Sequence, residues 1–102
     1  MSAAAYVIVE MKVSDPDQYT QYMAAAPAAV AAHGGEYIIR GGRHESLEGD
    51  WLPARVAVLK FPSYEQAKAF YDGAQYAAIR AKRLGAVEYF NSVLVEGVAA
   101  PV

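Results

Sequence analysis

The chain has 102 residues, of which 55% are hydrophobic and 20% charged, with a formal net charge of -2 and no cysteine. This composition fits a single domain over residues 1–102, with a modest core and no tendency to disorder. The lack of cysteine excludes disulfides, thiolate metal sites and cysteine nucleophiles. Because there is no basic cluster, no basic leader and no long apolar run, we expect no nucleic-acid partner, no membrane association and a cytoplasmic location.

The first half of the chain predicts a strand, a helix and a second strand. Residues 6–13 are rich in β-branched side chains, as is typical of a strand. Asp15, followed by proline, is a predicted helix cap, and apolar residues then recur at steps of three and four as far as the glycine pair at 34–35. Pro27 lies inside this helix and is expected to kink it. Residues 36–40 form the next predicted strand.

The second half predicts a strand at 55–61 and then a helix with a capping box, in which Ser63 is the cap and Gln66 its reciprocal partner. Gly73 is expected to break this helix, and a short helix over 75–84 and a last strand at 89–95 follow. The element order is therefore β-α-β-β-α-β. This order is typical of the ferredoxin-like α+β fold, a four-stranded antiparallel sheet with both helices on one face.

The predicted strands are apolar on both faces. In residues 6–11, and again in 56–59 and 90–95, both sets of alternate positions are mainly apolar. An antiparallel sheet with one wet face should instead alternate apolar and polar residues. Because two helices cover only one face, we expect a homodimer in which the sheets of two subunits pack face to face.

The stretch GGRHESLEGDW, residues 41–51, gathers charge between the second and third predicted strands. The simpler interpretation is a long hairpin connection whose glycines meet the needs of the backbone. The alternative is a site. Arg43 or Arg55 would hold a carboxylate or enolate with a planar guanidinium, His44 or Glu48 would move a proton, and Trp51 would close the pocket.

Two further features leave a structural and a functional interpretation open. Aromatic residues at helical spacing would wall a pocket for a small ligand or form ordinary core; they are Tyr19, Tyr22, Phe70 and Tyr71. Glu10 and Lys60 interrupt apolar strands and Arg40 closes another; such charges would form an ion pair at the dimer interface or act as a pocket acid or base. The two histidines lack the spacing of a metal site, so we expect no metal.

The segment AHGGEYIIRGGRHESLEGDWLPARVAVLKFPSYEQAKAFYDGAQY, followed by IRAKR, resembles the uncharacterised DUF1330 family. The glycine pairs, LEGDW, FPS and the tyrosines of the second helix carry the resemblance over nearly the whole chain. It implies the dimeric α/β-barrel superfamily and its face-to-face dimer, but no reaction, because the family has no assigned function. That superfamily also contains muconolactone isomerases, quinone-forming and haem-degrading monooxygenases and dye-decolourising peroxidases, so the fold does not choose the chemistry.

Two functions remain open from the sequence. The first is a small-molecule enzyme or binder for a carbonyl- or carboxylate-bearing metabolite, without a cofactor; residues 63–84 lack the histidine with which relatives of the superfamily hold haem. The second is a non-enzymatic oligomeric binding or structural module, in which Glu48 and Arg55 bridge subunits. An RNA-binding function would require exposed aromatic and basic residues on the third strand, and the strand at 55–61 lacks the glycine-aromatic pattern of RNA-recognition motifs.

Overall fold

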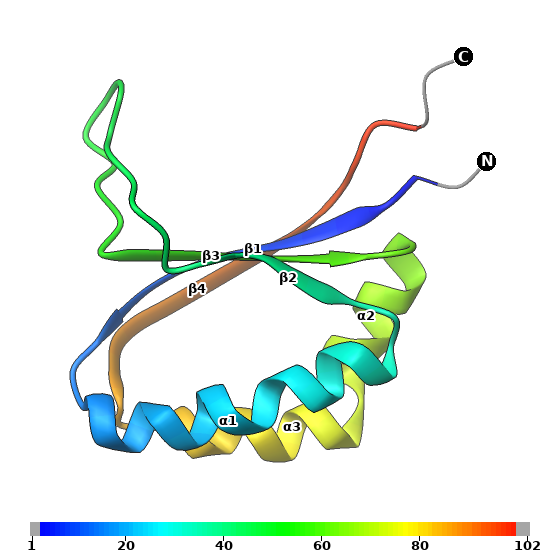
Figure 1. Ribbon diagram of the computed structural model, residues 1–102, viewed down its shortest axis with the longest axis horizontal. Coiled ribbons are helices and arrows are strands. Elements are labelled where there is room, and N and C mark those ends of the chain that lie inside the picture. Colours follow the sequence, from blue (N-terminus) through cyan, green and yellow to red (C-terminus); the bar gives the residue numbers. More distant parts are fainter. Residues whose placement is uncertain (1–2, 100–102) are drawn as a thin grey trace.

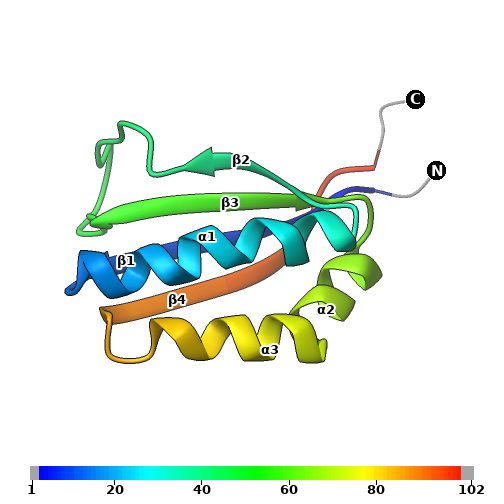
Figure 2. The ribbon, with the colours of Figure 1, turned by 60° about the horizontal axis from the view of Figure 1, so that its bottom comes forward.

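The computed structural model describes residues 3–99 and has a sheet layer covered on one side by helices (Figure 1). Its elements are β1 (Ala5–Val13), α1 (Pro16–Ala32), β2 (Glu36–Arg40), β3 (Arg55–Phe61), α2 (Tyr64–Asp72), α3 (Ala74–Arg80), a 3₁₀ turn η1 (Ala81–Arg83) and β4 (Val87–Glu96). The four strands are antiparallel in the order β2-β3-β1-β4. Figure 2 shows α1 and α3 side by side across the sheet. The predicted ferredoxin-like order and the single helical layer are confirmed.

The helices begin where the sequence predicts. Asp15 accepts a hydrogen bond from the backbone N–H of Gln18 at 3.1 Å, which caps α1, and Ser63 accepts one from Gln66 at 3.1 Å, which caps α2. The reciprocal half of the predicted capping box differs, because the Ser63 hydroxyl donates to the Gln66 side-chain oxygen at 3.3 Å. Gly73 separates α2 from α3, as predicted.

The core lies between the sheet and the helices. Alternate residues of β1 point into it, namely Ala5, Val7, Val9 and Met11, and all four are buried. Phe61 and Phe70 are the largest fully buried side chains, with ring centroids 5.1 Å apart. No helix within residues 3–99 is long and apolar enough to cross a membrane.

The opposite face of the sheet carries apolar side chains that no element of the described chain covers. Ile39, Val93 and Val95 have 45%, 53% and 43% of their surface exposed. They lie on the outer face with Ile8 and Val58, which pair with each other across β1 and β3. Figure 1 shows that the connection between β2 and β3 rises on this same side, away from the helices.

Glu10 and Lys60 both lie on this outer face and do not pair with each other within the described chain, so the ion pair expected at a dimer interface stays a prediction. Glu10 lies opposite Val56, whereas Lys60 lies opposite Tyr6, four residues along β1. Within the described part of the chain the only ion pairs are Lys12–Glu88 and Lys68–Asp72. Glu10 instead accepts hydrogen bonds from neutral side chains.

Candidate functional site

A small cavity of about 30 Å³ lies between the sheet and the helices. Its volume is enough for one or two water molecules. Sixteen residues line it: Val7, Val9, Met11, Tyr19, Tyr22, Met23, Tyr37, Arg40, Arg55, Ala57, Leu59, Phe70, Tyr71, Tyr76, Phe90 and Ser92. The expected aromatic wall of Tyr19, Tyr22, Phe70 and Tyr71 is therefore present, and three of these four rings are also buried core. The only charged residues in the lining are two arginines.

Arg55 lies between this inner cavity and a larger surface hollow of about 470 Å³. The two spaces share four lining residues, Arg55, Met11, Tyr19 and Met23. Arg55 is half-buried at the first position of β3, and within residues 3–99 it forms no ion pair. The shared wall thus places an unpaired guanidinium where a ligand in the hollow would meet the inner cavity.

The backbone at Gly41 makes room for this guanidinium. Gly41 has a φ of +75°, a conformation that side chains other than glycine rarely adopt. A Cβ atom added there would lie 2.5 Å from Cζ and 2.5 Å from Nη1 of Arg55. Gly41 is therefore needed both for the turn and for the position of Arg55.

Arg40, the second arginine in the lining, is held by a backbone carbonyl of α1 that has no partner within the helix. Pro27 has no N–H, so it cannot bond to the carbonyl of Met23 four residues earlier. That carbonyl accepts a hydrogen bond from Arg40 Nη2 at 2.8 Å. The Arg40 guanidinium also lies 4.5 Å from the centre of the Tyr37 ring. The proline inside the helix thus provides the acceptor that fixes a cation beside the cavity.

Three tyrosine hydroxyls in or beside the cavity are kept neutral. Burial raises the pKa of Tyr37 to about 12. Burial likewise raises the pKa of Tyr22 far above its ordinary value, with a further contribution from Tyr76. The pKa of Tyr19 is also raised by burial, against the opposing charges of Arg55, Arg83 and Arg40. These phenols therefore act as hydrogen-bond donors rather than as anions at neutral pH.

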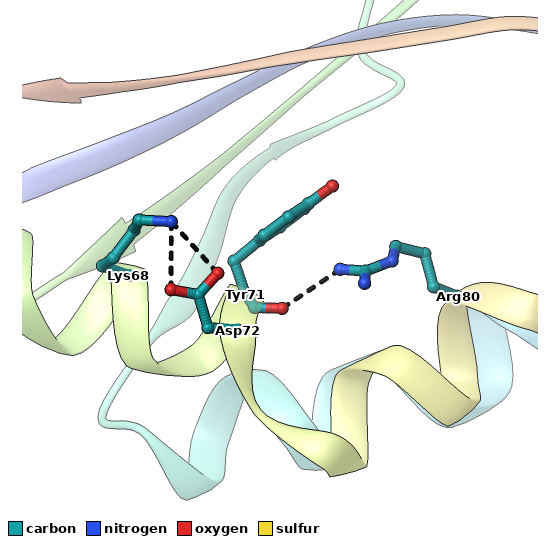
Figure 3. Close-up of polar contacts among 4 residues, drawn as sticks. All are labelled: Lys68, Tyr71, Asp72 and Arg80. Atoms are coloured by element: carbon teal, nitrogen blue, oxygen red, sulfur yellow. Dashed lines mark hydrogen bonds and ion pairs between the residues drawn. The ribbon is translucent and has the colours of Figure 1, made fainter.

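Tyr71 lines the cavity from α2. Figure 3 shows its side chain with those of Lys68, Asp72 and Arg80. The Arg80 guanidinium lies 4.3 Å from the centre of the Tyr71 ring and donates to the Tyr71 backbone carbonyl at 3.0 Å. That carbonyl lies at the end of α2, where the last carbonyls have no N–H donor within the helix. Lys68 and Asp72 pair on the same helix at 3.0 Å. Arg80 therefore holds Tyr71 in place while keeping its own charge near the cavity wall.

His44 joins the two sides of the 41–54 loop. Its Nε2 lies 2.7 Å from the carbonyl oxygen of Pro53, and its Nδ1 lies 3.1 Å from that of Gly42. Both carbonyls raise the pKa of His44, Gly42 first, because only a doubly protonated ring donates to both. His44 borders the surface hollow together with Arg55. In this geometry neither ring nitrogen is free to meet a ligand.

The other candidates of the loop lie away from the inner cavity. Arg43 and Glu48 are exposed, and neither borders the cavity or the hollow beside Arg55. Trp51, 62% exposed, donates from Nε1 to a Glu10 carboxylate oxygen at 2.7 Å on the outer face of the sheet. The structure therefore brings together Arg55 and Tyr71 at the cavity, with His44 at its approach, and places Arg43, Glu48 and Trp51 away from both spaces.

Two functional features were not found from the sequence. One is the role of Arg40, which the proline four residues after Met23 could have suggested. The other is the hydroxyl pair of Tyr22 and Tyr76, which are 54 residues apart in the sequence and meet only through helix packing. No group of three or more His, Asp or Glu side chains within residues 3–99 is arranged to hold a metal ion.

Residues 4–98 match a family described as "Domain of unknown function (DUF1330)". A Rhodopseudomonas palustris protein of unknown function superposes with a TM-score of 0.72 at 16% identity, over 98% of this chain and 86% of that chain. A dimeric ferredoxin-like protein of unknown function from Thermobifida fusca has a TM-score of 0.62 at 16% identity, over 94% and 92%.

A proposed antibiotic biosynthesis monooxygenase from Caulobacter crescentus has a TM-score of 0.61 at 14% identity, over 96% of this chain and 92% of that chain. No curated protein matches the sequence. At these identities the likeness to the solved structures shows the fold and not the chemistry.

Proposed function

The chain belongs to the DUF1330 family, which has no assigned function, and we propose from the geometry of its cavity that it binds a small carboxylate- or carbonyl-bearing metabolite, as an enzyme or as a binder. The observation that carries the proposal is Arg55, a half-buried cation without an ion-pair partner in the described chain, in the wall between the inner cavity and the surface hollow.

The charge around Arg55 favours an anion. A cation removed from water is costly unless it is paired, and no carboxylate lines either space. The planar guanidinium matches a carboxylate with two parallel hydrogen bonds. The hollow of about 470 Å³ is within the usual size of small-molecule sites, and its remaining wall includes apolar side chains. A small organic acid therefore fits both the space and the charge.

The long side chains of the shared wall allow the two spaces to join. Met11, Met23 and Arg55 have several rotatable bonds each, and methionine adapts to irregular volumes at little cost. A ligand carboxylate at Arg55 would leave the rest of the molecule either in the hollow or among the aromatic rings.

Calorimetric titration with benzoate, with benzamide as the uncharged control, tests this proposal. We expect benzoate to bind and benzamide not to bind. Arg55→Ala should weaken benzoate binding by roughly 10- to 100-fold, since a hydrogen-bonded charge is worth about 1.5–3 kcal/mol. Arg43→Ala removes the same charge from the exposed loop and should leave the affinity unchanged. Equal losses in the two variants would contradict the assignment to Arg55.

The proposal includes a homodimer formed through the outer face of the sheet. This face carries exposed Ile39, Val93 and Val95, and apolar sheet faces of this kind pack against one another. The 41–54 loop rises on the same side and is tied to it through Trp51 and Glu10, so it would border the interface. The T. fusca protein described above is itself dimeric, which supports a dimer here.

Sedimentation equilibrium tests the dimer. Val93→Asp places a charge on the outer face and should give monomers at micromolar concentration. Gln75→Asp places the same charge on an exposed position of α3, in the helical layer, and should remain dimeric. A monomeric wild-type protein would refute the dimer.

The Arg55→Ala protein, measured in the same way, separates the two functions. A dimer that has lost benzoate binding supports the metabolite site. Dissociation of that variant supports the alternative of a non-enzymatic oligomeric module, in which Arg55 bridges subunits.

A further inference from the structure

Two tyrosine hydroxyls meet in the interior of the molecule. Tyr22 from α1 and Tyr76 from α3 place their oxygens 2.5 Å apart, and either atom could be the donor. Only 7% of Tyr22 and 5% of Tyr76 is exposed, and both residues line the inner cavity. Their rings are fixed by packing, with Tyr22 edge-on to Phe90 at 6.0 Å and Tyr76 against Phe70 at 4.3 Å between centroids.

One of the two phenol hydrogens has no acceptor within the pair. Each phenol has one hydrogen, and the contact between the two oxygens uses one of them. Neither hydroxyl has another hydrogen-bond partner among residues 3–99. The hydroxyl that accepts in the pair therefore retains a hydrogen with no protein acceptor. A buried donor is satisfied by an oxygen from outside the chain, and the cavity of about 30 Å³ is the size of such a group.

The chemistry of the pair favours a ligand oxygen that accepts a hydrogen bond. Burial raises the pKa of Tyr22, so the pair stays protonated and donates rather than accepts. When one hydroxyl donates to the other, the second becomes a stronger donor. The guanidinium groups of Arg40 and Arg55 in the same lining make the potential there positive. A carbonyl, enol or phenol oxygen of the ligand, each of which accepts a hydrogen bond, matches this environment.

We propose that the Tyr22–Tyr76 pair donates a hydrogen bond to a second oxygen of the ligand whose carboxylate Arg55 holds. The inference rests on the proposed function and narrows it. The ligand is a small oxo- or hydroxy-carboxylate, in which a ketone, enol or phenol oxygen occupies the inner cavity. In an enzyme, the pair and the arginines would stabilise negative charge on this oxygen.

Comparison of benzoate with 4-hydroxybenzoate tests the pair, because the two probes differ by one hydroxyl. We expect the wild-type protein to bind 4-hydroxybenzoate roughly tenfold more tightly, as one additional good hydrogen bond provides. The double variant Tyr22→Phe with Tyr76→Phe should bind both probes with the affinity of benzoate. It should fold, since removing both partners of a buried hydrogen bond is nearly neutral.

Tyr64→Phe is the matched control. It makes the same change at the first residue of α2, in an exposed tyrosine that lines neither the inner cavity nor the hollow beside Arg55. This variant should keep the tenfold preference. Benzoate binding without any preference for 4-hydroxybenzoate in the wild-type protein would overturn the role of the pair and leave the Arg55 site standing. Failure of both probes to bind would overturn the proposed function as well.

Discussion

Gly41→Ala tests whether the backbone of the 41–54 loop sets the position of Arg55. At a φ of +75° an alanine costs about 1–2 kcal/mol in folding free energy. For a chain of this length, a loss of 1 kcal/mol lowers the melting temperature by roughly 4–8 °C. The new Cβ would also lie 2.5 Å from Arg55 Cζ, so the guanidinium must move by about 1 Å to reach an ordinary contact distance. We expect this shift to weaken benzoate binding by about tenfold.

Two other glycines of the same loop separate the two effects. Gly49 has a φ of +77°, and a Cβ there meets no atom within 4 Å. Gly49→Ala should therefore lower the melting temperature by a similar amount and leave benzoate affinity unchanged. Gly42 lacks a positive φ and is equally open, so Gly42→Ala should change neither quantity.

The assay is calorimetric titration with benzoate on the three variants, after their melting curves have been recorded by circular dichroism. The reasoning is refuted if Gly41→Ala loses stability as Gly49→Ala does but retains the wild-type affinity. In that case Arg55 does not hold the carboxylate from the position that Gly41 permits.

Three further predictions concern pH and packing. The pKa of His44 is raised, so the charged ring stabilises the loop at pH values below the ordinary histidine pKa of 6.5, and this stabilisation is lost as the pH rises through the raised pKa. Hydrogen exchange of the 41–54 amides should therefore become faster with pH by more than the intrinsic increase. His44→Gln should show only the intrinsic increase. Tyr37, with its pKa raised to about 12, should ionise last among the solvent-reachable tyrosines in an ultraviolet titration, and the stability it contributes should be lost as the pH rises from about 10 to 12; Tyr37→Phe should reduce that loss. Gly35→Ala should cost about 1–3 kcal/mol in urea unfolding, because its Cβ would lie 2.5 Å from the fully buried Phe61 ring; an unchanged midpoint would show that the ring moves freely.

The local parts of the fold were predictable because short-range chemistry determines them. Asp15 and Ser63 cap their helices through N–H groups three residues away, and Gly73 interrupts the second helix. The two-sided apolar pattern of the strands likewise predicted an outer face that remains uncovered in the single chain.

The site was predictable only in part, because its members meet through tertiary packing. Arg55 was identified from its place beside a buried strand, and it does line the cavity. Charge density in the loop indicated Arg43 and Glu48 equally well, yet both are exposed and neither lines the cavity or the hollow beside Arg55. Nothing in the local sequence of Tyr22 or Tyr76 indicates their contact, which depends on how α1 and α3 cross the sheet.

Side chains alternate along β1 between the cavity and the outer face of the sheet. Val7, Val9 and Met11 face the cavity, whereas Ile8 and Glu10 face the outer surface. Substitutions at odd positions of β1 therefore change the lining of the cavity and leave the outer face as it is, whereas substitutions at even positions change the outer face alone. Under the proposed function, the ligand site and the dimer interface can thus be altered independently along one strand.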